Sequence, residues 1–200
     1  MRVCVFCASS DASPPHYRAV AAELGTAIAR EGWSLVYGGG NIGLMGEVAR
    51  AALAGGAHVT GVIPHQLATR EVALEGVTEL IRTDTMRERK AIMDERSDAF
   101  VVLPGGIGTL EELVEIVTLK QLGYHDRAIV ILDDEGYWEP LVDQLRRMVE
   151  QSLAAPALLS LVSVTGDVPA TLAALRDYVA PPVGAGPAEE LEVVQAPPDR

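Results

Sequence analysis

The segment Leu103–Glu112 constrains the fold more than any other part of the sequence. An apolar run, Ala99–Leu103, ends at a proline, and three glycines follow before Thr109. Apolar residues then recur at helical spacing from Leu110 onward. This pattern predicts a buried strand, a tight turn and an amphipathic helix. The turn suits a phosphate group, because glycines let backbone N–H groups approach a ligand and a helix N-terminus attracts anions.

The same alternation of apolar runs and amphipathic segments extends over most of the chain. It predicts strands over Arg2–Cys7, Trp33–Tyr37, His58–Ile63, Val77–Arg82, Asp98–Leu103 and Ala128–Leu132, and a last short strand within Leu158–Val164. Helices are expected over 15–31, 47–54, 85–96, Thr109–Leu122, Trp138–Leu153 and Val168–Tyr178, with a polar loop or short helix between Pro64 and Gly76. Strands that alternate with helices predict a doubly wound, Rossmann-like parallel sheet with helices on both faces. Ligands of such folds bind at the carboxyl ends of the strands.

Length and charge narrow the possible classes of protein. A chain of 200 residues fits a single Rossmann-like nucleotide-binding domain over 1–180, and 181–200 lacks apolar periodicity and is expected to be a disordered tail. The net charge of −12 argues against nucleic-acid partners. No apolar run reaches the length of a membrane span, and the first strand is too short for a signal peptide, so we expect a cytoplasmic protein without membrane partners.

Cys4 and Cys7 form a C-x-x-C pair. A redox or zinc site would place such a pair at a helix start or in a knuckle with further ligands. Here both lie in the first predicted strand, where odd spacing sends the side chains to opposite faces, and no second cysteine pair exists. We expect two buried structural cysteines and no metal site.

The glycine cluster Gly38–Gly46 follows the second strand and formally contains the G-x-G-x-x-G dinucleotide fingerprint. The fingerprint normally follows the first strand, and the next strand here ends without the carboxylate that binds a ribose, so NAD binding is disfavoured. A P-loop is excluded because no Gly-Lys-Ser/Thr is present. The cluster fits either a nucleotide phosphate or ribose, or only a tight turn.

Two charged residues allow both a functional and a structural interpretation. Arg89 shares a helical stripe with Met86, Lys90 and Met93, so it is either held by a partner at an inward face or extends into solvent. Thr109-x-x-Glu112 matches a capping box, so Glu112 either satisfies the helix start or acts on a ligand. Glu111 lies about 100° further round the helix, so both carboxylates are not expected to face one ligand.

These motifs together resemble the Lonely Guy family, the cytokinin riboside 5′-monophosphate phosphoribohydrolases often mislabelled lysine decarboxylases. The family pattern Pro-Gly-Gly-x-Gly-Thr-x-x-Glu matches 104–112, and Met-x-x-Arg-Lys matches 86–90. The Gly-Gly-Gly-Asn-x-Gly-Leu-Met-Gly loop matches Gly38–Gly46, and Cys-x-Ser-Ser matches Cys7–Ser10. The resemblance covers about residues 2–150.

The resemblance implies hydrolysis of the N-glycosidic bond of an N6-modified AMP, with release of free base and ribose 5-phosphate. It implies a homodimer without an organic cofactor, whose partner is a small nucleoside 5′-monophosphate, and it makes Arg89 and Glu112 the catalytic pair. Glu112 would stabilise the oxocarbenium-like transition state and activate water, whereas Arg89 would either assist the departing base or position Glu112. Substrate binding is expected at Ser9, Gly39, Gly40, Asn41, Gly43, Met45, Glu71, Met86, Arg89, Lys90, Gly105, Gly106, Ile107, Gly108, Thr109, Leu110, Glu111, Glu112 and Thr118.

One loop departs from the family pattern. The family commonly has Pro-Arg-Glu followed by a Gly-Glu-Thr-like segment, whereas this chain has Thr69-Arg70-Glu71 followed by Val72–Glu75. The preferred N6 substituent therefore does not follow from the resemblance. A molybdenum-cofactor carrier or an AMP sensor would keep the glycine loops without needing Arg89 together with Glu112. A pyridoxal-phosphate decarboxylase is disfavoured, since neither lysine of the chain lies in a cofactor motif.

Overall fold

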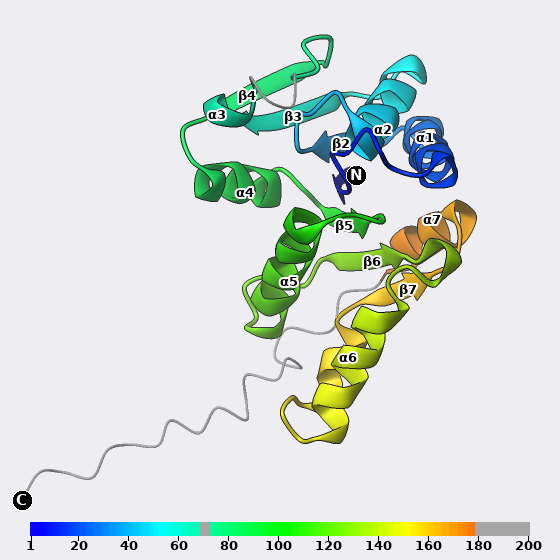
Figure 1. Cartoon of the computed structure of the whole chain (residues 1–200), viewed down its shortest axis with the longest axis vertical. Helices are drawn as coiled ribbons and strands as arrows, with labels where there is room; N and C mark the ends of the chain where they lie inside the picture. The colour runs from blue at the N-terminus through cyan, green and yellow to red at the C-terminus, as the bar shows by residue number, and fades with distance from the viewer. Residues whose placement is uncertain (69–72, 179–200) are drawn as a thin grey trace, which may run out of the picture.

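The computed structural model describes residues 1–68 and 73–178, which form alternating strands and helices (Figure 1). The strands are β1 (Arg2–Phe6), β2 (Ser34–Tyr37), β3 (Val59–Pro64), β4 (Glu79–Thr83), β5 (Ala99–Val102), β6 (Ala128–Leu132) and β7 (Ser163–Thr165). The helices are α1 (Pro15–Arg30), α2 (Gly43–Ala54), α3 (His65–Ala68), α4 (Met86–Glu95), α5 (Ile107–Gln121), α6 (Glu139–Glu150) and α7 (Val168–Arg176), with short 3₁₀ turns at Asp134–Gly136 and Pro156–Ser160. None of these helices is both long and apolar enough to cross a membrane.

The described strands form one parallel, seven-stranded sheet in the order β4-β3-β2-β1-β5-β6-β7. The chain builds outward from β1 to β4 on one side, then returns to place β5 against the other edge of β1. The predicted doubly wound fold is therefore confirmed. The order reverses between β1 and β5, where the crevice of such a sheet binds ligands.

Two apolar clusters hold helices against the two faces of the sheet. One cluster joins the sheet to α1, α2 and α7, and the other joins it to α4, α5 and α6 (Figure 1). Cys7 belongs to the first cluster and Cys4 to the second, and both thiols are buried and free. The expectation of two structural cysteines on opposite faces is confirmed.

Several predicted boundaries are wrong because turn chemistry shifts the ends of elements. The last strand is Ser163–Thr165, since a 3₁₀ turn over Pro156–Ser160 takes up the beginning of the expected segment. The second helix begins at Gly43, inside the glycine cluster rather than after it. The helix expected from Trp138 begins one residue later, and it ends at Glu150 rather than at Leu153. The fifth helix begins at Ile107, two residues before the predicted Thr109, so neither Glu111 nor Glu112 lies in its first turn. The expected tail, 181–200, lies outside the described residues.

Candidate active site

A cavity of about 390 Å³ opens at the carboxyl ends of β1 and β5, where the strand order reverses. Its walls come from the segment after β1, the glycine turn before α5, and the starts of α2 and α4. The lining residues are Cys7, Ala8, Ser9, Ser10, Met45, Leu67, Met86, Arg89, Gly106, Ile107, Gly108, Thr109 and Glu112. All four sequence motifs therefore contribute to one cavity, and the loop Gly38–Gly46 does so through Met45 alone.

Backbone hydrogen bonds join the three loops around this cavity. The Ala8 N–H donates to the Pro104 carbonyl at 3.2 Å, and the Met45 N–H donates to the Ala8 carbonyl at 3.2 Å. Gly43 has a φ of +59°, and a Cβ at this position would lie 2.6 Å from the Ser10 backbone nitrogen. Glycine is therefore required at Gly43, because the two loops are in backbone contact there.

The N-terminus of α5 presents free donors to the cavity. The first intrahelical bond runs from the Leu110 N–H to the Gly106 carbonyl at 3.0 Å, so the N–H groups of Ile107, Gly108 and Thr109 precede the hydrogen-bonded part of the helix. The N-cap is Gly106, which provides no side-chain bond, and the expected capping box of Thr109 and Glu112 is not formed. The open amides and the helix dipole together suit an anion.

Arg89 and Glu112 form a buried ion pair that faces this cavity. The Arg89 Nη1 lies 3.1 Å from the Glu112 Oε1, and both residues are only 5% exposed. The Arg89 Nε donates to the Val62 carbonyl at 3.1 Å, which fixes the plane of the guanidinium. A Cβ on Gly38 would lie 2.1 Å from the Arg89 Nη2, so this glycine leaves room for the arginine. Arg89 is therefore held inside the protein and does not extend into solvent.

Lys90 faces away from this cavity, toward a second one. Its Nζ lies 2.5 Å from the Glu111 Oε1 and 2.9 Å from the Glu115 Oε2, so it ties α4 to α5. Partial burial acts against the charge of Lys90, but the hydrogen bonds to Glu111 and Glu115 outweigh it and raise its pKa. Lys90 and Glu115 line a cavity of about 410 Å³ between α4 and α5, and Glu112 lines both cavities.

Comparisons with known proteins agree with this geometry. A family model described as "Possible lysine decarboxylase" matches residues 45–175. The cytokinin riboside 5′-monophosphate phosphoribohydrolase LOG1 of Arabidopsis thaliana is 43% identical over 178 residues, which cover 89% of this chain and 84% of that protein. The probable phosphoribohydrolase LOGL9 of Oryza sativa subsp. japonica is 46% identical over 89% of this chain and 78% of its own length.

The chain belongs to the Lonely Guy family. Solved structures show how widely its fold is shared: the molybdenum cofactor (Moco) carrier protein of Chlamydomonas reinhardtii superposes with a TM-score of 0.66 at 25% identity, covering 88% of this chain and 94% of the carrier. A carrier and an enzyme family thus share one scaffold, and the side chains in the cavity carry the argument for function.

Part of the site expected for a Lonely Guy protein lines the cavity, and part does not. The expected residues in its wall are Ser9, Met45, Met86, Arg89, Gly106, Ile107, Gly108, Thr109 and Glu112. Gly39, Gly40, Asn41 and Gly105 belong to the surrounding loops, Gly43 begins α2, and Leu110 lies in α5. Lys90 faces the second cavity, and Glu111 and Thr118 are exposed on α5. Glu71 lies outside the described residues.

Four lining residues were not among the expected binding residues: Cys7, Ala8, Ser10 and Leu67. Cys7 and Ser10 belong to the Cys-x-Ser-Ser motif, whose position after β1 was the available signal. Burial raises the pKa of the Cys7 thiol, and the Glu112 carboxylate raises it further, so Cys7 stays a neutral thiol. Leu67 lies in the short helix α3, which no motif marked.

Proposed function

We propose that this Lonely Guy protein hydrolyses the N-glycosidic bond of AMP and N6-modified AMP, releasing the free base and ribose 5-phosphate. One observation carries the proposal: a buried Arg89–Glu112 pair shares a cavity with the free N-terminal amides of a helix. The amides suit a phosphate and the carboxylate suits a developing positive charge. A nucleoside 5′-monophosphate carries the phosphate at C5′ and develops the positive charge at C1′, on opposite sides of the same ribose.

The 5′-phosphate would bind the N–H groups of Gly106, Ile107, Gly108 and Thr109. A Cβ on Gly106 or on Gly108 would meet no atom within 4 Å, so both glycines border open space. A phosphate that fills this space would explain why residues without a side chain occupy both positions. Binding of the phosphate would orient the sugar and favour the monophosphate over the nucleoside.

Glu112 would act at C1′ of the ribose. Cleavage of the bond to the base gives the ring the positive charge of an oxocarbenium ion, which a nearby carboxylate stabilises. The same carboxylate would accept a proton from the attacking water, whose oxygen forms the new bond to C1′. The base leaves with the bonding electrons and takes up one proton, which balances the proton that Glu112 removes from the water. Arg89 holds Glu112 in place, and its remaining N–H groups are near enough to the cavity to offset charge on the departing base.

The two alternative functions fit these side chains less well. A carrier or sensor does not require a carboxylate buried beside its ligand. Burying a charged group costs free energy, and enzymes commonly bury such groups in their active sites. A pyridoxal-phosphate decarboxylase requires a lysine in the cavity. Lys90 is paired with Glu111 and Glu115, and the Lys120 Nζ donates to the Arg127 carbonyl at 2.8 Å, so neither lysine lines this site.

The proposal is tested by incubating the purified protein with AMP, N6-isopentenyl-AMP and adenosine and following the free base by chromatography. We expect base release from the two monophosphates and far less from adenosine. The ratio of the two monophosphate rates measures the preference for the N6 substituent. Binding of AMP without release of adenine or of the modified base would instead support a carrier or sensor.

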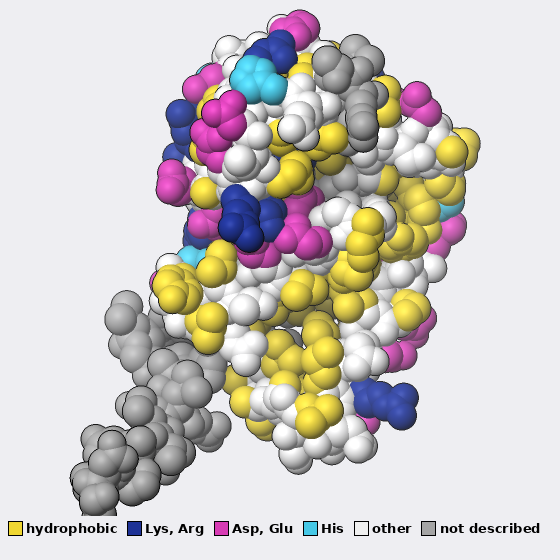
Figure 2. Space-filling model, turned by 60° about the vertical axis from the view of Figure 1, so that its left-hand side comes forward, with side chains coloured by type: hydrophobic (Ala, Val, Ile, Leu, Met, Phe, Trp, Pro, Cys, Tyr) yellow, Lys and Arg dark blue, Asp and Glu magenta, His cyan; other side chains and the backbone are white. Residues whose placement is uncertain are grey.

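We further propose that the protein is a homodimer that pairs through α5 and α6. Ile107 is 82% exposed and Val114 is 49% exposed two turns further along α5. No residue of α6 is fully buried, and Leu141, Leu145 and Met148 on its apolar face are only partly buried where they pack against the core. Figure 2 shows hydrophobic side chains gathered over the lower half of the face to which these helices belong. Such a surface beside a cavity suits a second copy of the chain.

Val114→Asp tests the dimer by placing a charge at this surface. We expect light scattering to show a dimer for the wild type and a monomer for the variant. Val164→Asp is the control, since Val164 is 45% exposed on the short strand β7 and belongs to neither helix. A monomeric wild type, or equal dissociation by both variants, would contradict the proposed interface. A cytoplasmic location stays a prediction from the sequence.

A further inference from the structure

We propose that Tyr137 is a positioning residue that aims the Gly106 N–H at the substrate's phosphate. The inference rests on the proposed function, since it assumes that a phosphate binds at the start of α5. Tyr137 does not line the cavity. It acts from behind the glycine turn, through a single hydrogen bond to the backbone.

The hydroxyl of Tyr137 donates to the Gly105 carbonyl, with 2.5 Å between the two oxygens. Gly105 and Gly106 share one peptide group, and no peptide bond among the described residues is cis. In a trans peptide, the C=O and the N–H of the same plane point in opposite directions. A donor that fixes the Gly105 carbonyl on one side therefore fixes the Gly106 N–H on the other, and Gly106 lies in the cavity wall.

A glycine turn needs such an external restraint. Residues flanking this peptide are both glycines, which have the widest choice of backbone angles, so the peptide plane is poorly determined by its own sequence. The Gly106 N–H also precedes α5, where no intrahelical bond constrains it. Hydrogen bonding at the carbonyl polarises the amide as well, which makes its N–H a stronger donor.

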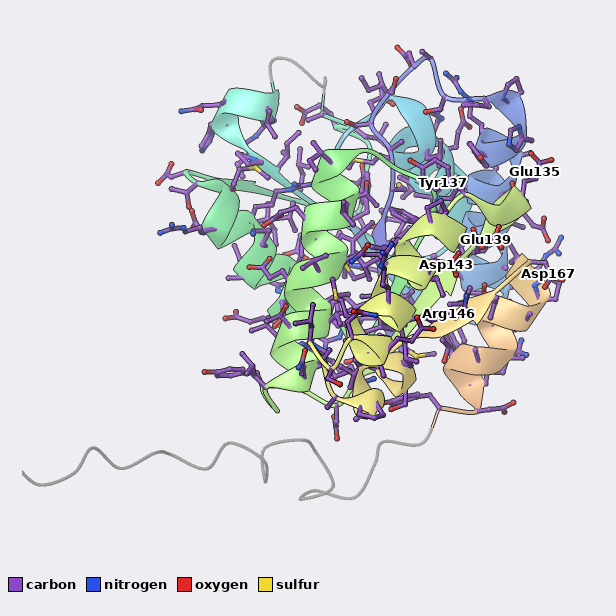
Figure 3. The ribbon with its side chains drawn as sticks, turned by 60° about the horizontal axis from the view of Figure 1, so that its bottom comes forward. Glu135, Tyr137, Glu139, Asp143, Arg146 and Asp167 are labelled. Atoms are coloured by element: carbon purple, nitrogen blue, oxygen red, sulfur yellow. The ribbon has the colours of Figure 1, made fainter. Side chains whose placement is uncertain are left out.

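The position of Tyr137 is itself fixed by the turn that follows β6. Glu135 and Gly136 adopt left-handed φ values of +56° and +74°, which reverse the chain. The Asp133 Oδ1 accepts the Trp138 N–H at 2.6 Å and closes this turn. Figure 3 shows Tyr137 at the end of α6 nearest the loop into α5, with Glu139 and Asp143 further along α6.

Aromatic contacts hold the ring in one orientation. The centroid of the Tyr137 ring lies 5.7 Å from that of Tyr17 and 5.0 Å from that of Trp138, both in edge-to-face geometry. Tyr17 comes from α1 and Trp138 from the start of α6, so three parts of the chain meet behind the glycine turn. These contacts need only the ring, whereas the orientation of the peptide needs the hydroxyl.

Tyr137→Phe separates the two roles, because it removes the hydroxyl and keeps the ring. Calorimetry with ribose 5-phosphate as the probe should show a Kd raised about three- to tenfold, the range expected for one lost hydrogen bond. The KM for AMP should rise by a similar factor, with kcat at saturating AMP little changed. Tyr178→Phe is the matched control: its hydroxyl donates to the Asp126 carbonyl at 2.6 Å, and its Kd should equal that of the wild type.

The outcomes distinguish this inference from the proposed function. If the wild type binds neither ribose 5-phosphate nor AMP, the proposed function fails. If the wild type binds and Tyr137→Phe binds equally well, the role of Tyr137 is refuted while the proposed function stands. Inhibition by adenosine, which lacks the phosphate, should be the same for wild type and variant. Equal weakening of adenosine and ribose 5-phosphate would indicate general damage to the cavity and would overturn the inference.

Discussion

The buried pair of Arg89 and Glu112 offers a quantitative test of the site's energetics. Coulomb's law for two charges 3.1 Å apart gives an attraction of about 5 kcal/mol at an effective dielectric constant near 20. Desolvation of both groups offsets much of this attraction, so the intact pair adds little net stability. Removing one partner is different, because it leaves the other charge buried without its counterion.

We therefore expect Arg89→Met and Glu112→Gln each to lower the free energy of unfolding by roughly 3–5 kcal/mol. The double variant should lose no more than Arg89→Met alone, because it leaves neither charge buried. The coupling energy is then at least as large as the loss in Glu112→Gln, about 3 kcal/mol or more, which is a large part of the roughly 5–15 kcal/mol that stabilises a typical domain. Urea titration followed by circular dichroism measures all four free energies.

A surface pair supplies the control for this cycle. Arg146 and Asp143 lie 2.6 Å apart on α6, and both side chains are more than half exposed. Their coupling energy, measured with Arg146→Met and Asp143→Asn, should be about 0.5 kcal/mol or less. Losses at Arg89 and Glu112 that add within about 0.5 kcal/mol would refute the reasoning, since independent sites behave in that way.

Two further predictions concern other parts of the chain. Gly108→Ala should leave the melting temperature unchanged but weaken ribose 5-phosphate binding, since the added methyl enters open space on the ligand side. Gly105→Ala should instead lower the melting temperature, because its Cβ would lie 2.1 Å from the Thr109 Oγ1. Unchanged binding by Gly108→Ala would argue against a phosphate there. Burial lowers the pKa of Lys120 from 10.5 to about 8, so above pH 8 the unfolded chain binds the extra proton and stability rises with pH up to about 10.5. Relative to Lys120→Met, urea titration should show the wild type gaining about 3 kcal/mol over this range, and parallel pH curves for the two proteins would refute the shift.

The sheet was predictable because each strand carries its own signal. Runs such as Ala99–Leu103 are apolar throughout, as strands buried on both faces must be, and each one ends at glycine, proline or small polar residues. The right-handed crossover rule limits how each strand–helix–strand unit is arranged, but it leaves the order of the strands open. Element ends were less predictable. Gly106 is the N-cap of α5 and forms no side-chain hydrogen bond, so no capping motif marks this position in the sequence. The capping-box pattern of Thr109 and Glu112 indicated a later helix start, which is wrong.

The site was predictable in its motifs but not in its pairings. Helical spacing placed Arg89 and Lys90 on one stripe, yet they face different cavities, because spacing says nothing about where the neighbouring helix lies. Glu111 is an expected substrate-binding residue, and its ion pair with Lys90 has no signal in the sequence. The hydrogen bond from Tyr137 to Gly105 joins segments far apart in the chain, so only the folded structure brings it into view.

The role of Glu112 is the central claim, and the rate of base release by Glu112→Gln tests it most directly. The variant keeps the size of the side chain and removes its charge. With saturating AMP, we expect kcat to fall by about 10²–10³-fold, while the Kd for ribose 5-phosphate stays within about a factor of two, because the carboxylate acts mainly on the transition state. A variant that releases base at the wild-type rate, or one that loses ribose 5-phosphate binding with its chemistry intact, would contradict the assignment of Glu112 as the catalytic carboxylate.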